Sequence, residues 1–279
     1  MRLLVIILFA LPVAAQQYLT GNIEYIRGFR STVLSNSRDI IIYLPPDYYR
    51  SNAQYPVFYM HDGQNLFDGN TSFIRGQEWR VDETAEQLIS GGEIEPIIIV
   101  GVYNAGSQRI YEYTPTVDET FQAGGGGDLY GKFLVEELKP YIDSKYRTLK
   151  AAEHTALGGS SLGGLITIYL GLKYPQVFGK LAVMSPSVWW NSRYILGYVN
   201  SSAKVNCKIW EDVGTSEGSD FTTKQMVKLD ARKLRDALIK KGWELGKDLV
   251  YFEAKRAQHN EAAWAARMPE VLKYLFPKK

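Results

Sequence analysis

Apolar residues along this chain gather in short runs that alternate with longer amphipathic segments. The short runs are rich in β-branched and aromatic residues and predict strands over 39–44, 55–61, 96–103, 155–157, 180–184, 204–213 and 248–253. Segments with apolar residues three or four positions apart predict helices over 79–89, 129–142, 162–172, 225–240 and 261–275. From residue 55 onward, strand and helix therefore alternate.

This alternation is typical of βαβ units, which form a parallel sheet with helices on both faces. The amino-terminal strands follow each other without a helix, so we expect them to form an antiparallel edge. The run PIIIVGVY at 96–103 is apolar throughout, as expected of a strand buried on both faces. The sequence predicts an α/β fold with a mainly parallel central sheet. Ligands in such sheets bind beyond the carboxyl ends of the strands.

Residues 1–17 read MRLLVIILFALPVAAQQ and have the order of a secretory signal. Arg2 supplies a positive charge, residues 3–13 are apolar, and Ala15 follows small residues suited to cleavage. We expect residues 1–15 to be a signal peptide, with the mature protein secreted or periplasmic. The alternative is a buried amino-terminal strand or helix. The apolar run is shorter than the roughly 20 residues of a transmembrane helix, so no stable membrane span is expected.

Composition narrows the function classes. The chain has 279 residues, of which 46% are hydrophobic and 22% charged, so we expect residues 16–279 to form one globular domain. Its 32 basic and 30 acidic residues give a net charge of +2, which argues against nucleic-acid binding. A single cysteine, Cys207, and three histidines argue against a disulfide framework and a metal centre. No metal or cofactor is expected.

The segment 159–163 reads GSSLG and matches G-x-S-x-G with Ser161 at its centre. It lies between a predicted strand and a predicted helix, where a nucleophile elbow belongs. Glycines at 159 and 163 would avoid collisions with neighbouring elements, and the Leu162 amide could face a developing oxyanion. Ser160 is the neighbouring alternative but lacks glycines at both flanking positions. The simpler interpretation is a Gly/Ser-rich turn that caps a helix.

A general base and an acid should follow the nucleophile along the chain. His259 is the only histidine after Ser161, and it lies in a loop between the last predicted strand and helix. Glu217, just beyond the strand at 204–213, is the preferred acid because a carboxylate there could orient the His259 ring. Asp212 remains the main alternative. The further candidates in this region are Glu211 and Asp220.

Two other features could complete a site. Gly63 follows an early strand, and the next amide, that of Gln64, is the predicted second oxyanion donor. The alternative is an ordinary loop of turn-forming residues. Trp189 and Trp190 follow another strand and could stack on an aromatic or sugar group of a substrate, although large aromatic side chains are often buried in the core.

Five segments together resemble the esterase D-like family of the α/β-hydrolase superfamily. They are YMHDGQNLFDG (59–69), EWRVDE (78–83), LGGSSLGGL (157–165), DVGTSE (212–217) and QHNEAAW (258–264). The resemblance extends over nearly all of the mature chain and implies the α/β-hydrolase fold. It implies Ser161 as nucleophile, His259 as base and Glu217 as acid, with Gln64 at the oxyanion. Many relatives carry Asp at the acid position, which keeps Asp212 open.

The resemblance implies an exported serine esterase that cleaves carboxylic esters through an acyl-enzyme. Its substrates would be small-molecule or oligosaccharide esters, such as feruloyl or acetyl esters of plant polysaccharide. One alternative is an enterochelin-type siderophore esterase, whose trianionic ligand would need a basic pocket; Arg75, Arg80 and Arg109 are its candidate cations. Others are a mycolyl-type acyltransferase and a catalytically silent binding protein. The sequence does not predict an oligomeric state.

Overall fold

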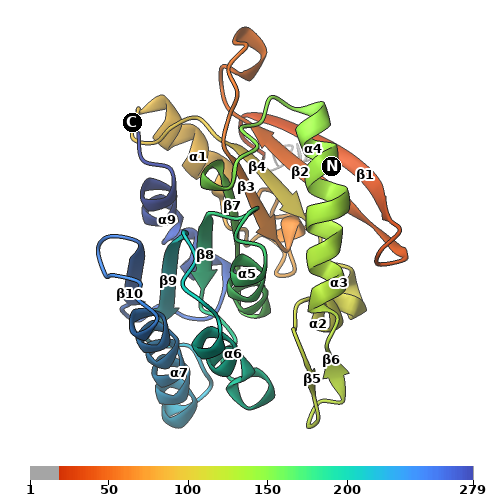
Figure 1. The fold of residues 1–279 in the computed structure, drawn as a ribbon. Coiled ribbons are helices and arrows are strands. Elements are labelled where there is room, and N and C mark those ends of the chain that lie inside the picture. Colours follow the sequence, from red (N-terminus) through yellow and green to blue (C-terminus); the bar gives the residue numbers. More distant parts are fainter. Residues whose placement is uncertain (1–18, 279) are drawn as a thin grey trace, which may run out of the picture.

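The computed structural model describes residues 19–278, and an eight-stranded sheet runs through them (Figure 1). The predicted signal peptide at 1–15 lies outside the described residues. In spatial order the strands are β1-β2-β4-β3-β7-β8-β9-β10. Their bounds are Asn22–Ser31 (β1), Asn36–Leu44 (β2), Val57–His61 (β3), Ile98–Val102 (β4), Thr155–Ser160 (β7), Lys180–Met184 (β8), Lys208–Gly214 (β9) and Leu249–Ala254 (β10). A separate hairpin pairs β5 (Val117–Asp118) with β6 (Ala123–Gly124).

Strand pairing confirms a mainly parallel sheet with an antiparallel amino-terminal edge. β1 pairs antiparallel with β2, and β2 pairs antiparallel with β4. Every neighbouring pair from β4 through β10 is parallel. β1 was not among the predicted strands. Its register shifts between Ile26 and Phe29, and this bulge interrupts the alternation of apolar and polar residues from which a strand is predicted.

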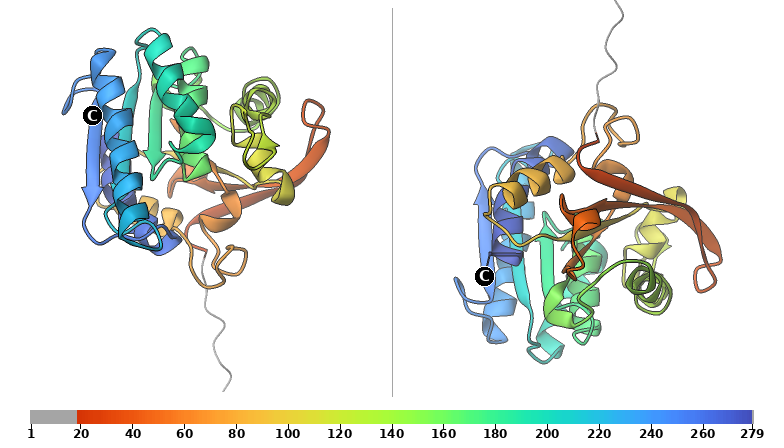
Figure 2. Two further views of the ribbon diagram at one scale, coloured as in Figure 1. Left: turned by 90° about the horizontal axis from the view of Figure 1, so that it is seen from below. Right: turned by 90° about the horizontal axis from the view of Figure 1, so that it is seen from above.

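Helices cover both faces of the sheet, as predicted (Figure 2). One apolar cluster includes side chains from α3 (Gly127–Lys132), the π-helical segment (Phe133–Leu138), α5 (Leu162–Lys173), α6 (Trp190–Ser201) and α7 (Phe221–Lys240). A second cluster, on the opposite face, includes side chains from α1 (Val81–Ser90), α8 (Glu261–Ala265) and α9 (Met268–Leu275). The remaining helices are α2 (Arg109–Glu112) and α4 (Lys139–Lys145), with short 3₁₀ turns at Tyr48–Arg50, Gly63–Asn65, Gly106–Gln108 and Ala152–His154. No helix within residues 19–278 is both long and apolar enough to cross a membrane.

Several predicted elements differ in detail. The segment 129–142, predicted as one α-helix, contains a π-helical stretch between α3 and α4. The closing helix at 261–275 is two helices, because α8 ends at Ala265 and α9 starts at Met268 with Pro269 in its first turn. The strand predicted from 204 begins at Lys208. Helix α6 was missed: Asn191, Ser192 and Arg193 near its start have positive φ, which hydrophobic spacing cannot indicate.

Candidate active site

Ser161 occupies a one-residue turn between β7 and α5, which is the context predicted for a nucleophile elbow. Its backbone has φ 60° and ψ −122°, a conformation rarely adopted by residues with a side chain. The Ser161 amide donates to the Met184 carbonyl at 3.1 Å, which ties the turn to β8. The Ser161 hydroxyl lies 3.2 Å from the Ser187 hydroxyl.

The glycines flanking Ser161 differ in how closely they are packed. A Cβ added at Gly159 would lie 3.0 Å from the His61 ring, tighter than most real contacts. One added at Gly163 would lie 3.4 Å from the same side chain, which is ordinary contact. The close packing expected on both sides of the serine is therefore present at Gly159 and absent at Gly163.

His259 lies in the loop after β10, and its ring contacts a buried carboxylate. His259 Nδ1 is 2.8 Å from Glu217 Oε2. Because a carboxylate accepts hydrogen bonds, this contact orients the ring with Nδ1 as the donor, and in a neutral imidazole the lone pair is then on Nε2. The ring also meets the Trp264 ring edge-on, with centroids 5.0 Å apart. Within residues 19–278 the ring makes no direct hydrogen bond to the Ser161 hydroxyl, although both side chains line the same two cavities.

The Glu217 carboxylate is held by a buried network. Its Oε1 accepts from the Gly214 amide at 2.7 Å and from the Ser185 hydroxyl. Ser185 Oγ in turn accepts from Trp264 Nε1 at 3.1 Å and from Arg267 Nη2 at 2.9 Å. Sequence reasoning missed these three supporting side chains. The one feature of the sequence that could have indicated them is that Trp264 and Arg267 follow His259 closely along the chain.

Asp212, the alternative acid, has different partners. It accepts from Trp210 Nε1 at 2.8 Å and from the Ser185 amide at 3.2 Å, and it forms an ion pair with Arg267 at 3.2 Å. Burial raises the pKa of Asp212 to about 6, and Arg267 opposes that rise. The carboxylate that contacts His259 is that of Glu217.

The two remaining acid candidates also lie elsewhere. Glu211 is fully buried in β9, and neither of its carboxyl oxygens has a hydrogen-bond partner within residues 19–278. Asp220 caps the amino terminus of α7 by accepting from the Thr223 amide at 3.0 Å.

The loop carrying Gln64 follows β3 as a 3₁₀ turn, and Gln64 lines a cavity together with Ser161 and His259. Among residues 19–278, no acceptor takes a hydrogen bond from the backbone N–H of Gln64 or of Leu162. Leu162 is the first residue of α5, where amides have no partner inside the helix. Both amides predicted as oxyanion donors are therefore without a partner in the part of the chain that the structure describes.

Two cavities flank Ser161. The first has a volume of about 300 Å³, and its walls include Asp62, Asn104, Arg109, Glu261, Phe73 and Ile74. The second has a volume of about 310 Å³, and its walls include Ser185, Pro186, Ser187, Trp189, Val227 and Asp230. Trp189 is 42% exposed and lines the second cavity, whereas Trp190 is buried and donates from Nε1 to the Thr116 carbonyl at 2.9 Å. Only one of the paired tryptophans therefore faces the site.

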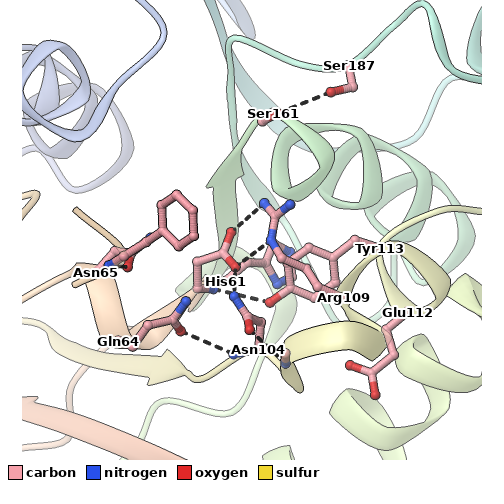
Figure 3. Close-up of polar contacts among 12 residues, drawn as sticks. His61, Gln64, Asn65, Asn104, Arg109, Glu112, Tyr113, Ser161 and Ser187 are labelled. Carbon is pink, nitrogen blue, oxygen red and sulfur yellow. Dashed lines mark hydrogen bonds and ion pairs between the residues drawn. The ribbon is translucent and has the colours of Figure 1, made fainter. Parts of the chain in front are cut away.

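Two charged residues of the first cavity, Asp62 and Arg109, form an ion pair. Arg109 donates to both Asp62 oxygens, at 2.7 and 2.8 Å, and Figure 3 shows it beside Asn104 and Tyr113. Arg75 and Arg80 line neither cavity. Within residues 19–278, no group of three His, Cys, Asp or Glu side chains is arranged to hold a metal ion.

Comparisons with known proteins bear on the family and the fold. The family model described as Putative esterase matches residues 31–275. The uncharacterized protein YbbA of Bacillus subtilis is 24% identical over 90% of this chain and 98% of its own. A siderophore enterobactin esterase of Emericella nidulans is 31% identical over 50% of this chain and 48% of its own. The crystal structure of the BES protein from Bacillus cereus superposes with a TM-score of 0.72 at 24% identity, covering 96% of this chain and 99% of that one.

Proposed function

We propose, since this chain belongs to the Putative esterase family and is a carboxylic ester hydrolase, that it is a serine esterase with Ser161 as its nucleophile. The observation that carries the proposal is the His259–Glu217 contact of 2.8 Å beside the two cavities that Ser161 also lines. A histidine oriented by a carboxylate near a strained serine is the arrangement that activates a hydroxyl. Glu217 is accordingly the proposed acid.

In the first half of the reaction, His259 Nε2 takes the Ser161 proton while Oγ bonds to the ester carbonyl carbon. Glu217 stabilises the imidazolium that forms. The Gln64 and Leu162 amides donate to the negative oxygen of the tetrahedral intermediate. As the intermediate collapses, its bond to the alcohol oxygen breaks, and His259 gives its proton to the leaving alcohol.

In the second half, a water molecule replaces the alcohol. His259 takes a proton from this water, whose oxygen bonds to the acyl carbon. The bond from that carbon to Ser161 Oγ then breaks, and the proton returns to Ser161. The enzyme is restored and the carboxylic acid leaves.

The substrate we favour is a neutral ester with an aromatic group, such as a feruloyl ester of plant polysaccharide. Trp189 offers an exposed ring on the wall of the second cavity, where it can stack on such a group. A siderophore ester is the second candidate, since the Emericella nidulans relative is a siderophore esterase. We also propose that residues 1–15 are removed on export and that residues 16–279 form one secreted or periplasmic domain.

Hydrolysis by the mature chain and by Ser161→Ala tests the proposal. The substrates are p-nitrophenyl acetate, methyl ferulate, an acetylated xylo-oligosaccharide and a catecholate siderophore. Ser161→Ala should lose at least about 10³-fold in kcat/KM on every ester that the wild type cleaves. Ser160→Ala is the matched variant and should keep at least about a tenth of wild-type activity.

Substantial activity in Ser161→Ala would contradict the nucleophile assignment. Loss confined to Ser160→Ala would transfer the role to the neighbouring serine. An added sugar acceptor separates hydrolysis from acyl transfer, because a transferase would form a new ester and less free acid. A wild-type protein that cleaves none of these esters would favour the catalytically silent alternative.

A further inference from the structure

We propose that the Asp62–Arg109 ion pair holds the loop that carries the Gln64 amide, so Arg109 is a positioning residue for the oxyanion donor. The inference rests on the proposed function. Under this proposal Arg109, which lines the first cavity, pairs with the protein's own loop and does not bind the charge of an anionic substrate. The argument comes from the backbone of the loop, its side-chain contacts and the charges in the cavity.

Two consecutive residues of the loop have backbones that are strained or closely packed. Asp62 has φ 57° and ψ 47°, a left-handed conformation that is unfavourable for residues with a side chain. Gly63 packs so closely on β4 that an added Cβ would lie 2.5 Å from the Gly101 carbonyl carbon. Gln64 follows directly, so the direction of its N–H depends on this conformation. A strained loop of this kind persists only where its surroundings fix it.

Residues 104–109 supply contacts that fix the loop on both sides of Gly63. Arg109 Nε and Nη2 donate to Asp62 Oδ1 and Oδ2 at 2.7 and 2.8 Å. Asn104 Nδ2 donates to Asp62 Oδ1 at 2.7 Å. The backbone N–H of Asn104 donates to Gln64 Oε1 at 3.2 Å. One short segment therefore holds the residues before and after the glycine (Figure 3).

The Asp62 backbone is held from the same region. Its amide donates to the Tyr113 hydroxyl at 3.2 Å, and the Arg109 guanidinium carbon lies 5.0 Å from the centre of the Tyr113 ring. Arg109 opens helix α2, and Tyr113 directly follows that helix. Helix α2 and the residue after it therefore fix both the main chain and the side chain of Asp62.

The side chains that line the first cavity carry no excess of positive charge. Among its lining residues, Arg109 is the only lysine or arginine, and its partner Asp62 carries the opposite charge. Burial alone would raise the pKa of Asp62, but Arg109 holds it below its usual value, so the carboxylate stays ionised. Glu261 adds another carboxyl group to the wall. A neutral ester suits this cavity better than a ligand with several negative charges.

Kinetics on two esters with the same leaving group test the inference. The esters are p-nitrophenyl acetate, which is neutral, and mono-p-nitrophenyl succinate, whose acyl group carries a carboxylate. Arg109→Ala should lower kcat by about 10- to 100-fold on both, because a misplaced oxyanion donor weakens transition-state binding. KM should stay within about threefold on both, since ground-state binding is not the function of this arginine.

Conservative and combined variants make the test independent of simple misfolding. Arg109→Lys and Asp62→Asn should each recover part of kcat. The double variant Asp62→Ala/Arg109→Ala should lose no more than the worse single variant, because both residues serve one contact. Arg232→Ala is the matched control. Arg232 donates from Nε and Nη2 to the two carboxylate oxygens of Glu253, at 2.7 and 2.9 Å, and it lines neither cavity.

The inference is wrong if Arg109→Ala raises KM for the succinate ester alone while kcat stays unchanged, because Arg109 would then bind the substrate carboxylate. It is also wrong if the Asp62 and Arg109 losses multiply, or if folded Arg109→Ala keeps wild-type kcat. Failure of the proposed function is distinguishable, since it would appear as p-nitrophenyl acetate hydrolysis that Ser161→Ala does not reduce.

Discussion

The two sides of the candidate site differ in how firmly their side chains are held. The inner wall, made of Ser185, Glu217, Trp264 and Arg267, is buried and joined by hydrogen bonds. The outer rim, made of Phe73 and Trp189, is 86% and 42% exposed. Phe121, which lines neither cavity, packs against Trp189 with ring centres 5.8 Å apart.

This difference separates chemistry from recognition. A base whose carboxylate partner is fixed by several donors needs little reorganisation when charge develops, which is the condition for efficient electrostatic catalysis. Exposed aromatic side chains can change rotamer to fit different ligands at little cost. We therefore expect changes to the inner wall to act on kcat for every ester, and changes to the rim to act on KM for some esters.

The largest effect should follow from changing the inner-wall carboxylate. Glu217→Gln keeps the size of the side chain, but its amide can donate to His259 Nδ1 and so favour the tautomer that carries the proton on Nε2. A base with a proton already on Nε2 cannot accept one from Ser161, and kcat should fall by about 10³- to 10⁴-fold. Steady-state hydrolysis of p-nitrophenyl acetate measures this fall.

Asp212→Asn is the matched control for that experiment. This variant leaves Arg267 without the charge of its ion-pair partner. The free energy of unfolding should fall by about 3 kcal/mol, as for other buried pairs that lose one member. The folded variant should keep kcat within about tenfold of wild type. If Asp212→Asn abolished hydrolysis without loss of stability while Glu217→Gln stayed active, the two carboxylates would exchange roles.

A moderate effect is expected at the rim. Trp189→Ala removes an aromatic surface worth about 1 kcal/mol to a stacked ring, so KM for methyl ferulate should rise about fivefold. KM for p-nitrophenyl acetate should change less. Phe252→Ala is the matched control, since Phe252 is 45% exposed on β10 and lines neither cavity. Equal changes in KM for both esters would count against a stacking role.

The smallest effect on activity should come from Glu211, a buried residue of β9. Burial raises the pKa of Glu211 well above its ordinary value, so the folded state keeps a proton that the unfolded state releases. This contribution to stability is complete below the unfolded pKa of about 4.3 and is lost as pH rises towards the folded pKa, at up to about 1.4 kcal/mol per pH unit.

Glu211→Gln should therefore flatten the decline in unfolding free energy between pH 6.5 and 8.5, a range above the pKa of about 6 for Asp212. Urea unfolding at several pH values measures it, and kcat should stay close to that of wild type. An unchanged slope would show that Glu211 is ionised in the folded protein.

The sequence predicted those parts of the site that a short segment encodes. Ser161 and its glycines form a local motif, and His259 was identified by its position after a strand. The residues that hold Glu217 could not be found this way, because Ser185 lies about 80 residues from Trp264 and Arg267 and meets them only through the fold. Likewise, the sequence suggested Arg109 as a cation for an anionic ligand. It could not show that Asp62 pairs with this arginine and balances its charge.

Covalent labelling tests the central claim, that Ser161 is the nucleophile, most directly. The mature protein would be treated with a fluorophosphonate and digested, and the modified peptide would be identified by mass spectrometry. We predict one label on Ser161, absent in Ser161→Ala and slowed at least about 10²-fold in His259→Ala. A label on Ser160 or Ser187, or ester hydrolysis that continues when Ser161 is fully labelled, would contradict the claim.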